Sequence, residues 1–306
     1  MDEELRLLLE QNPWRGLAAR LRQETDWTRV NMVADGDENC ITAFNERLQR
    51  RGGRNAAEKE WNCRLRTECP PIPFIGNPQA GVWLLLMNPG FSPLDYYNFV
   101  DRDEGRRVMS DPRWEGKAIP LELLKPDSDV RFAARRELYV NSLDFSVEAG
   151  QEFYVLSNSM DTVRQTKKLH GGYNWYGSKL FKGWREEGGN VGDPSARFHA
   201  ASVEERVQVA SAQIFDLEYA AYHSIEFTNT NHYESFVHTA FWEQLVAYAL
   251  THGKTLIVRG KDLLRRVEGV NPQAFQAACE AGRILRFSGQ NASLSNRNLK
   301  VVHPES

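Results

Sequence analysis

An asparagine stands at the point where the longest apolar run in the first third of the chain ends. Asn88 follows the apolar residues 82–87 directly, and Pro89 and Gly90 come after it. A short apolar run that ends in a breaker indicates a strand buried on both faces. Open α/β sheets bind ligands at the carboxyl ends of such strands. The segment therefore predicts either an active-site asparagine or an ordinary exit from a strand.

A second polar segment follows the apolar run 283–287 near the other end of the chain. Residues 291–297 read NASLSNR, and residues 86–90 read LMNPG. Together they resemble the last and first motifs of the uracil-DNA glycosylase superfamily, in its mismatch-specific and single-strand-selective branches. Ala292 stands where the last motif usually has proline. Residues 217–224, LEYAAYHS, resemble the strand-end turn of the superfamily, with Ala221 in place of another proline.

This resemblance implies hydrolysis of the bond between a base and its sugar. The transition state carries positive charge on the sugar and negative charge on the departing base, so a water must be positioned and the base stabilised. By resemblance, Asn88 holds the attacking water, although an asparagine cannot act as a base. Asp95 is a candidate auxiliary carboxylate, and its alternative is an exposed aspartate at the start of a helix.

Two residues beside Asn88 bear on the size and stacking of the base. Gly90 matches the position where strict uracil enzymes have a tyrosine that blocks the C5 substituent of a pyrimidine, so a glycine leaves that space open. The alternative is a plain turn glycine. Phe91 either stacks on the flipped base or packs in the core.

Asp216 departs from the family in an informative way. It lies where the family has an asparagine that reads uracil, and a carboxylate only accepts hydrogen bonds. Its natural partner is the exocyclic amino group of cytosine, and a protonated carboxyl also donates. Glu218 competes for the same position, because a short strand end is easily aligned two residues out of register. A helix-capping or salt-bridged aspartate is the structural alternative.

The remaining candidates come from the last motif and from the strand-end turn. Asn291 stands where uracil enzymes have a histidine that donates to the base. By resemblance, Ser293 holds a DNA phosphate, and Arg297 contacts the backbone or fills the gap left by the flipped nucleotide. His223 is either a packing histidine at a strand end or a group that touches DNA or the substrate.

The elements that must position these residues alternate between strands and helices. Strands are predicted at residues 82–87, 213–215, 254–260 and 283–287. Helices are predicted at 40–51, 131–138, 236–251 and 263–281, and residues 3–25 are expected to form one or two helices broken at Pro13. The long connection is expected to hold a further strand at 152–156 and a helix at 174–184. This alternation predicts an α/β fold, a three-layer α/β/α sandwich with a central, mainly parallel sheet.

The domain boundaries follow from the positions of the motifs. Residues 1–70 are expected to form a helical N-terminal extension, and residues 71–306 a domain like the uracil-DNA glycosylases. Residues 92–206 are too long for one connection between core strands, so they predict an insertion that builds a wall beside the active site. Its aromatic residues and lysines are suited to stacking and phosphate contacts, or to an ordinary core beneath a charged face.

Composition limits the function classes. The chain has 306 residues and a formal net charge of −3, so binding to DNA would need a local basic patch. No run of 18 apolar residues and no signal peptide occur, so we expect a cytoplasmic protein without a membrane partner. Four cysteines are too few for a disulfide scaffold, and their spacing does not match an iron–sulfur site. No metal, other cofactor or obligate protein partner is therefore expected.

Three functions remain open at this point. The first is a DNA glycosylase that acts on a flipped-out modified pyrimidine, such as a cytosine enlarged at C5 by a hydroxymethyl or glucosyl group in phage DNA. Excision from incoming DNA would be an anti-phage defence. The second is a uracil or mismatch repair glycosylase, and the third is a non-catalytic nucleic-acid-binding protein of the same fold. An unrelated α/β hydrolase is disfavoured, because the chain has no G-x-S-x-G, P-loop or G-x-G-x-x-G motif.

Overall fold

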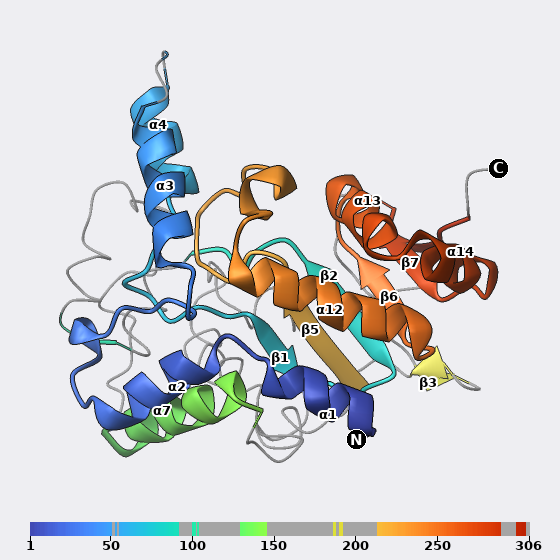
Figure 1. Ribbon diagram of the computed structural model, residues 1–306, viewed down its shortest axis with the longest axis horizontal. Coiled ribbons are helices and arrows are strands. Elements are labelled where there is room, and N and C mark those ends of the chain that lie inside the picture. The colour runs from blue at the N-terminus through green and yellow to red at the C-terminus, as the bar shows by residue number, and fades with distance from the viewer. Residues whose placement is uncertain are drawn as a thin grey trace.

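The computed structural model describes most of the two ends of the chain and little of its middle. The described residues are 1–50, 53, 55–91, 100–101, 103, 129–145, 186–187, 190–191, 213–288 and 298–303. In this part of the chain, helices pack against a mixed sheet of six strands, so the predicted α/β class is confirmed (Figure 1). The strand predicted at 152–156, the helix predicted at 174–184 and nearly all of the predicted insertion lie outside the described residues.

In the described part of the chain, four α-helices precede the first strand. Helix α1 (Glu3–Glu10) and helix α2 (Arg15–Gln23) are separated at Pro13, as predicted. The short η1 (Trp27–Arg29) follows α2, and α3 (Glu38–Gln49) and α4 (Ala56–Cys63) come after it. Apolar side chains of α1 and α2 belong to the same buried cluster as those of the sheet. Helix α2 packs against α7 (Asp129–Leu143), which comes from the middle of the chain.

The described part of the sheet has the order β1-β5-β2-β6-β7-β8. Its strands are β1 (Phe74–Gly76), β2 (Val82–Leu86), β5 (Ile214–Glu218), β6 (Thr255–Val258), β7 (Ile284–Phe287) and β8 (Leu299–Val301). Strands β5, β2, β6 and β7 are parallel, whereas β1 and β8 are antiparallel to their neighbours. The chain moves from β2 to β5 on one side and then to β6 on the other. This change of direction is the point where parallel sheets bind ligands.

The edge strands were not predicted. Strands β1 and β8 have only three residues each, and prolines flank β1. Neither strand is long enough to show an alternating pattern of apolar and polar residues. A separate pair of two-residue strands, β3 (Glu186–Glu187) and β4 (Asn190–Val191), lies outside this sheet.

The C-terminal helices cover one face of the sheet. Helix α12 (Val237–Thr251) crosses that face, and α13 (Lys261–Val270) and α14 (Pro272–Glu280) lie beside it (Figure 1). The single helix expected over 263–281 is two helices, because Asn271 leaves the helical conformation and caps α14, whose first residue is a proline. The short η5 (Thr230–Tyr233) precedes α12.

The two faces of β5 differ in chemistry. Phe215 and Leu217 point into the cluster that the described helices cover, together with Trp83 of β2. Asp216 and Glu218 alternate with them, so they point to the opposite face, and both are buried. Two carboxyl groups at buried positions of a central strand are unusual, since burial disfavours their charged form.

A buried aspartate joins the N-terminal helices to the rest of the molecule. Asp37 is fully buried and accepts hydrogen bonds from the hydroxyl of Tyr222, at 2.8 Å, and from the backbone N–H of Val237, at 2.6 Å. Its other contact is Nδ1 of His238, at 2.5 Å. The three partners lie in two different segments, so Asp37 fixes the start of α3 against α12 and against the turn that follows β5.

None of the described helices is both long enough and apolar enough to span a bilayer.

Candidate active site

Asn88 lies just beyond the carboxyl end of β2. Its side-chain nitrogen donates to the backbone oxygen and to the hydroxyl oxygen of Ser224, both at 3.1 Å. A backbone carbonyl only accepts, so the amide nitrogen must face Ser224. The amide oxygen then points elsewhere, and it accepts no hydrogen bond from any residue that the structure describes. Asn88 is half-buried, and an amide oxygen held in this way can accept a hydrogen bond from a water.

Ser224 is itself held in place. It is fully buried, and its hydroxyl donates to the backbone oxygen of Glu226 at 3.0 Å. Glu226 in turn is linked to α4, because its backbone N–H donates to the oxygen of Asn62 at 2.9 Å. Asn88 is therefore oriented by a chain of hydrogen bonds that ends in a helix.

Gly90 has a conformation and an environment that suit the predicted open space. Its φ is +72°, in the left-handed region that favours glycine. Among the described residues, a Cβ added at this position would have no heavy atom within 4 Å apart from its chain neighbours. The backbone oxygen of Gly90 contacts Nδ1 of His223, which keeps the glycine against the turn after β5.

Both ring nitrogens of His223 face backbone oxygens. His223 is 1% exposed, and its Nε2 lies 2.8 Å from the backbone oxygen of Pro70, while Nδ1 faces Gly90. The backbone oxygen of His223 also accepts from the N–H of Arg66 at 3.0 Å. The described contacts of His223 thus join three segments. They correspond to the packing role, which was one of the two roles that the sequence suggested for this histidine.

Phe91 has one ring face covered by a cation. The guanidinium carbon of Arg66 lies 4.2 Å from the centre of the Phe91 ring and 4.4 Å from that of Trp61. Burial lowers the pKa of Arg66, and the nearby Glu68 opposes this effect. Cation–π contacts are stronger where water is excluded, so Arg66 fixes the ring that follows the Asn88–Gly90 turn.

Asp216 and Glu218 occupy different depths in the sheet. Asp216 is paired in register with Ile75 and Leu84, in the middle of the strands, and is fully buried. Glu218 is the last residue of β5 and is paired with Leu86, two residues before Asn88. Burial and the neighbouring Asp216 raise the pKa of Glu218 well above its usual value, whereas Arg259 lowers it.

Four predicted site residues lie outside the described residues: Asp95, Asn291, Ser293 and Arg297. The ends of the segment that contains the last three are described. Strand β7 is parallel to β6 and β2, so Ser288 leaves the sheet at the same edge as Asn88. The N–H of Ser288 donates to the oxygen of Asn298 at 2.7 Å, so the two described ends of this segment lie side by side.

Metal binding finds no support in the described part of the chain. No group of three or more His, Cys, Asp or Glu residues there could hold an ion. All four cysteines are free thiols, three of them buried.

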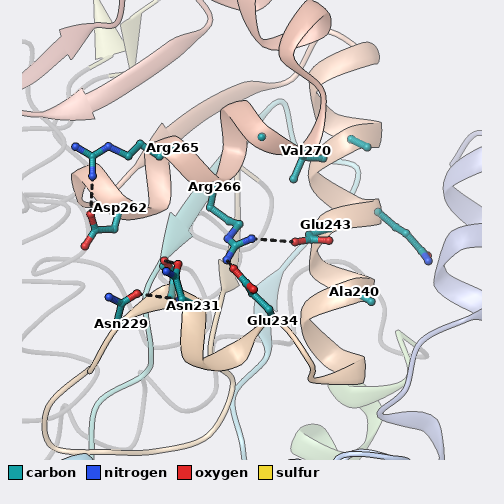
Figure 2. A pocket seen from close by; sticks show the side chains of 13 residues that line it. Asn229, Asn231, Glu234, Ala240, Glu243, Asp262, Arg265, Arg266 and Val270 are labelled. Carbon is teal, nitrogen blue, oxygen red and sulfur yellow. Dashed lines mark hydrogen bonds and ion pairs between the residues drawn. The ribbon is translucent and has the colours of Figure 1, made fainter.

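A hollow of about 750 Å³ lies elsewhere, between η5, α12 and α13 (Figure 2). Its charged side chains are paired with one another: Arg266 contacts Glu234 and Glu243, and Arg265 contacts Asp262. None of the predicted site residues that the structure describes lines it. Because opposite charges are already paired on its walls, we do not assign the active site to this hollow.

No protein-family model, curated protein or solved structure matches this chain. The geometry at the carboxyl edge of the sheet and the two sequence motifs are therefore the evidence for a function. Sequence reasoning missed Arg66, because a buried cation in an irregular segment has no periodicity. It included Ser224 only as part of the strand-end turn, without a role.

Proposed function

We propose that this protein is a DNA glycosylase that hydrolyses the N-glycosidic bond of a flipped-out, modified pyrimidine and leaves an abasic site. The observation that carries the proposal is the orientation of Asn88. Its amide nitrogen is engaged by Ser224, and its amide oxygen remains able to hold a water at the carboxyl edge of a parallel sheet. The resemblance of residues 86–90 and 291–297 to the motifs of the uracil-DNA glycosylase superfamily supports the same function.

In the proposed reaction, a water bound to the oxygen of Asn88 attacks C1′ of the sugar as the base departs. Positioning is the contribution of Asn88, since an amide does not remove a proton at neutral pH. The open space at Gly90 accommodates a substituent at C5 of the base. We therefore favour a cytosine enlarged at C5, of the hydroxymethyl or glucosylated kind found in some phage DNA.

The same proposal includes further features of the fold, the partner and the cellular location. They are a three-layer sandwich, a wall built by residues 92–206, DNA as the partner, and a cytoplasmic location where the enzyme would attack incoming phage DNA. In this proposal, Asn291, Ser293 and Arg297 complete the site from the segment between β7 and β8, and Asp95 is its auxiliary carboxylate.

The test compares labelled DNA that contains uracil, a thymine mismatch, cytosine, 5-hydroxymethylcytosine or its glucosylated form, followed by alkaline cleavage of abasic sites. We expect cleavage with the enlarged cytosines. Cleavage with uracil or the thymine mismatch alone would instead support a repair glycosylase. Binding without cleavage of any substrate would support a nucleic-acid-binding protein.

A pair of variants tests the role of Gly90. Gly90→Ala and Gly90→Tyr carry the same backbone strain, about 1–2 kcal/mol, because both place a side chain at positive φ. Only the tyrosine fills the space beside C5. We expect Gly90→Tyr to remove the glucosylated cytosine at least about fivefold more slowly than Gly90→Ala, since overpacking costs about 1–3 kcal/mol. Equal rates for the two variants in single-turnover assays would show that this space does not receive the substituent.

A further inference from the structure

Glu218, rather than Asp216, lies at the carboxyl edge of β5. Parallel strands place their carboxyl ends at one edge of a sheet, and Glu218 is paired in register with Leu86 of β2. Asn88 follows Leu86 by two residues. Asp216 precedes Glu218 by two residues on the same strand, so it lies deeper in the sheet, where β1 and β2 flank it on both sides. Of the two carboxyl groups, only that of Glu218 is level with the start of the Asn88 turn.

The carboxyl group of Glu218 is buried and incompletely satisfied. The residue is 5% exposed, and its Oε2 has no hydrogen-bond partner in the described part of the chain. A buried polar oxygen without a partner costs free energy, so a function is the expected compensation. The charged groups around it are Asp216 on the same strand and Arg259 at the end of β6.

Burial raises the pKa of Glu218, and the like charge of Asp216 raises it further, while Arg259 acts in the opposite direction. The raised pKa favours the protonated carboxyl group toward neutral pH. A protonated carboxyl has one O–H donor and one carbonyl acceptor. Cytosine offers the matching pair, an acceptor at N3 and an amino donor at N4. Glu218 is therefore matched to the base that the proposed function favours.

Cytosine also needs an acid more than uracil does. Uracil departs as an anion stabilised by two carbonyl groups, whereas cytosine has one carbonyl and leaves more easily after protonation at N3. A proton delivered to the base as the bond breaks lowers the barrier to departure. An acid beside N3 thus serves both recognition and catalysis.

We propose that Glu218 is the general acid of this site and selects cytosine-type bases, an inference that rests on the proposed glycosylase function. The O–H of Glu218 transfers its proton to N3 of the base, and the electron pair of the C1′–N1 bond moves into the ring. The base leaves neutral, as the N3–H tautomer. Water adds to C1′, and the proton that this water loses restores the acid form of Glu218 or passes to solvent.

The experiment measures single-turnover release of 5-hydroxymethylcytosine from duplex DNA between pH 6 and 10. The full-length wild type is compared with Glu218→Gln, Asp216→Asn and, as a control at a half-buried glutamate outside the site, Glu243→Gln. The acid form of Glu218 is the active one, so activity is present below its pKa and falls about tenfold per pH unit above it. We expect Glu218→Gln to be slower by about 100-fold or more and to lose this alkaline limb.

Asp216→Asn provides a second readout that does not depend on the folding of Glu218→Gln. Removal of the neighbouring negative charge lowers the pKa of Glu218, so the alkaline limb moves to lower pH. Glu243→Gln should match the wild type. Two results would overturn the assignment of Glu218 without contradicting the glycosylase function. One is a Glu218→Gln variant with the wild-type rate and the wild-type loss of activity at high pH. The other is an Asp216→Asn variant that loses activity at the same pH as the wild type. Absence of base release by the wild type would overturn the proposed function and this inference together.

Discussion

Asn88→Ala is expected to lower base release by at least about 100-fold while leaving DNA affinity nearly unchanged. The reason is that Asn88 positions a water, and a misplaced reacting group costs about that factor. Its side chain is held through Ser224 and presents its oxygen at the edge of the sheet, so alanine removes the water ligand without disturbing the strand. Single-turnover release and fluorescence anisotropy with labelled DNA measure the two quantities.

Ser224→Ala is the matched control for Asn88. It removes the hydroxyl acceptor but keeps the backbone acceptor, so the orientation of Asn88 is weakened and not lost. Loss of one such hydrogen bond costs about 0.5–1.5 kcal/mol, which corresponds to a rate decrease of about 2- to 10-fold. A wild-type rate in Asn88→Ala would mean that the asparagine is only a turn residue.

Asp37→Ala is expected to destabilise the fold by about 3–5 kcal/mol, because it leaves a buried histidine, a tyrosine hydroxyl and a backbone N–H without their shared acceptor. Urea unfolding followed by tryptophan fluorescence measures the loss. Asp35→Ala is the control, since Asp35 is exposed and its ion pair with Arg20 contributes at most about 1 kcal/mol. Equal stabilities of the two variants would show that the Asp37 cluster does not join the N-terminal helices to the core.

The parts of the fold that were predictable carry their own signal. Residues 82–87 form β2 as far as Leu86, because an unbroken apolar run between breakers has few other solutions. Strand β1 is different: Phe74–Gly76 is a strand only because Leu217 and Phe215 pair with it. Its identity depends on residues about 140 positions away in the sequence, which no local pattern contains.

In the candidate site, too, some features could be predicted from local sequence and others depend on tertiary structure. Asn88 and Gly90 were predictable, since a breaker after a buried strand is a local feature. The distinction between Asp216 and Glu218 was not, because it depends on the register of β5 against β2. Arg66 was missed for a related reason. Its place between Trp61 and Phe91 is created by tertiary packing around an irregular segment.

The most direct test of the glycosylase proposal is to count both products of one reaction. The protein is incubated with DNA that contains a single 5-hydroxymethylcytosine, the free base is quantified by mass spectrometry, and abasic sites are quantified with an aldehyde-reactive probe. We predict one free base for each abasic site with the wild type, and neither product above background with Asn88→Ala. DNA that is bound but yields neither product, with the enlarged cytosines and with uracil alike, would contradict the account.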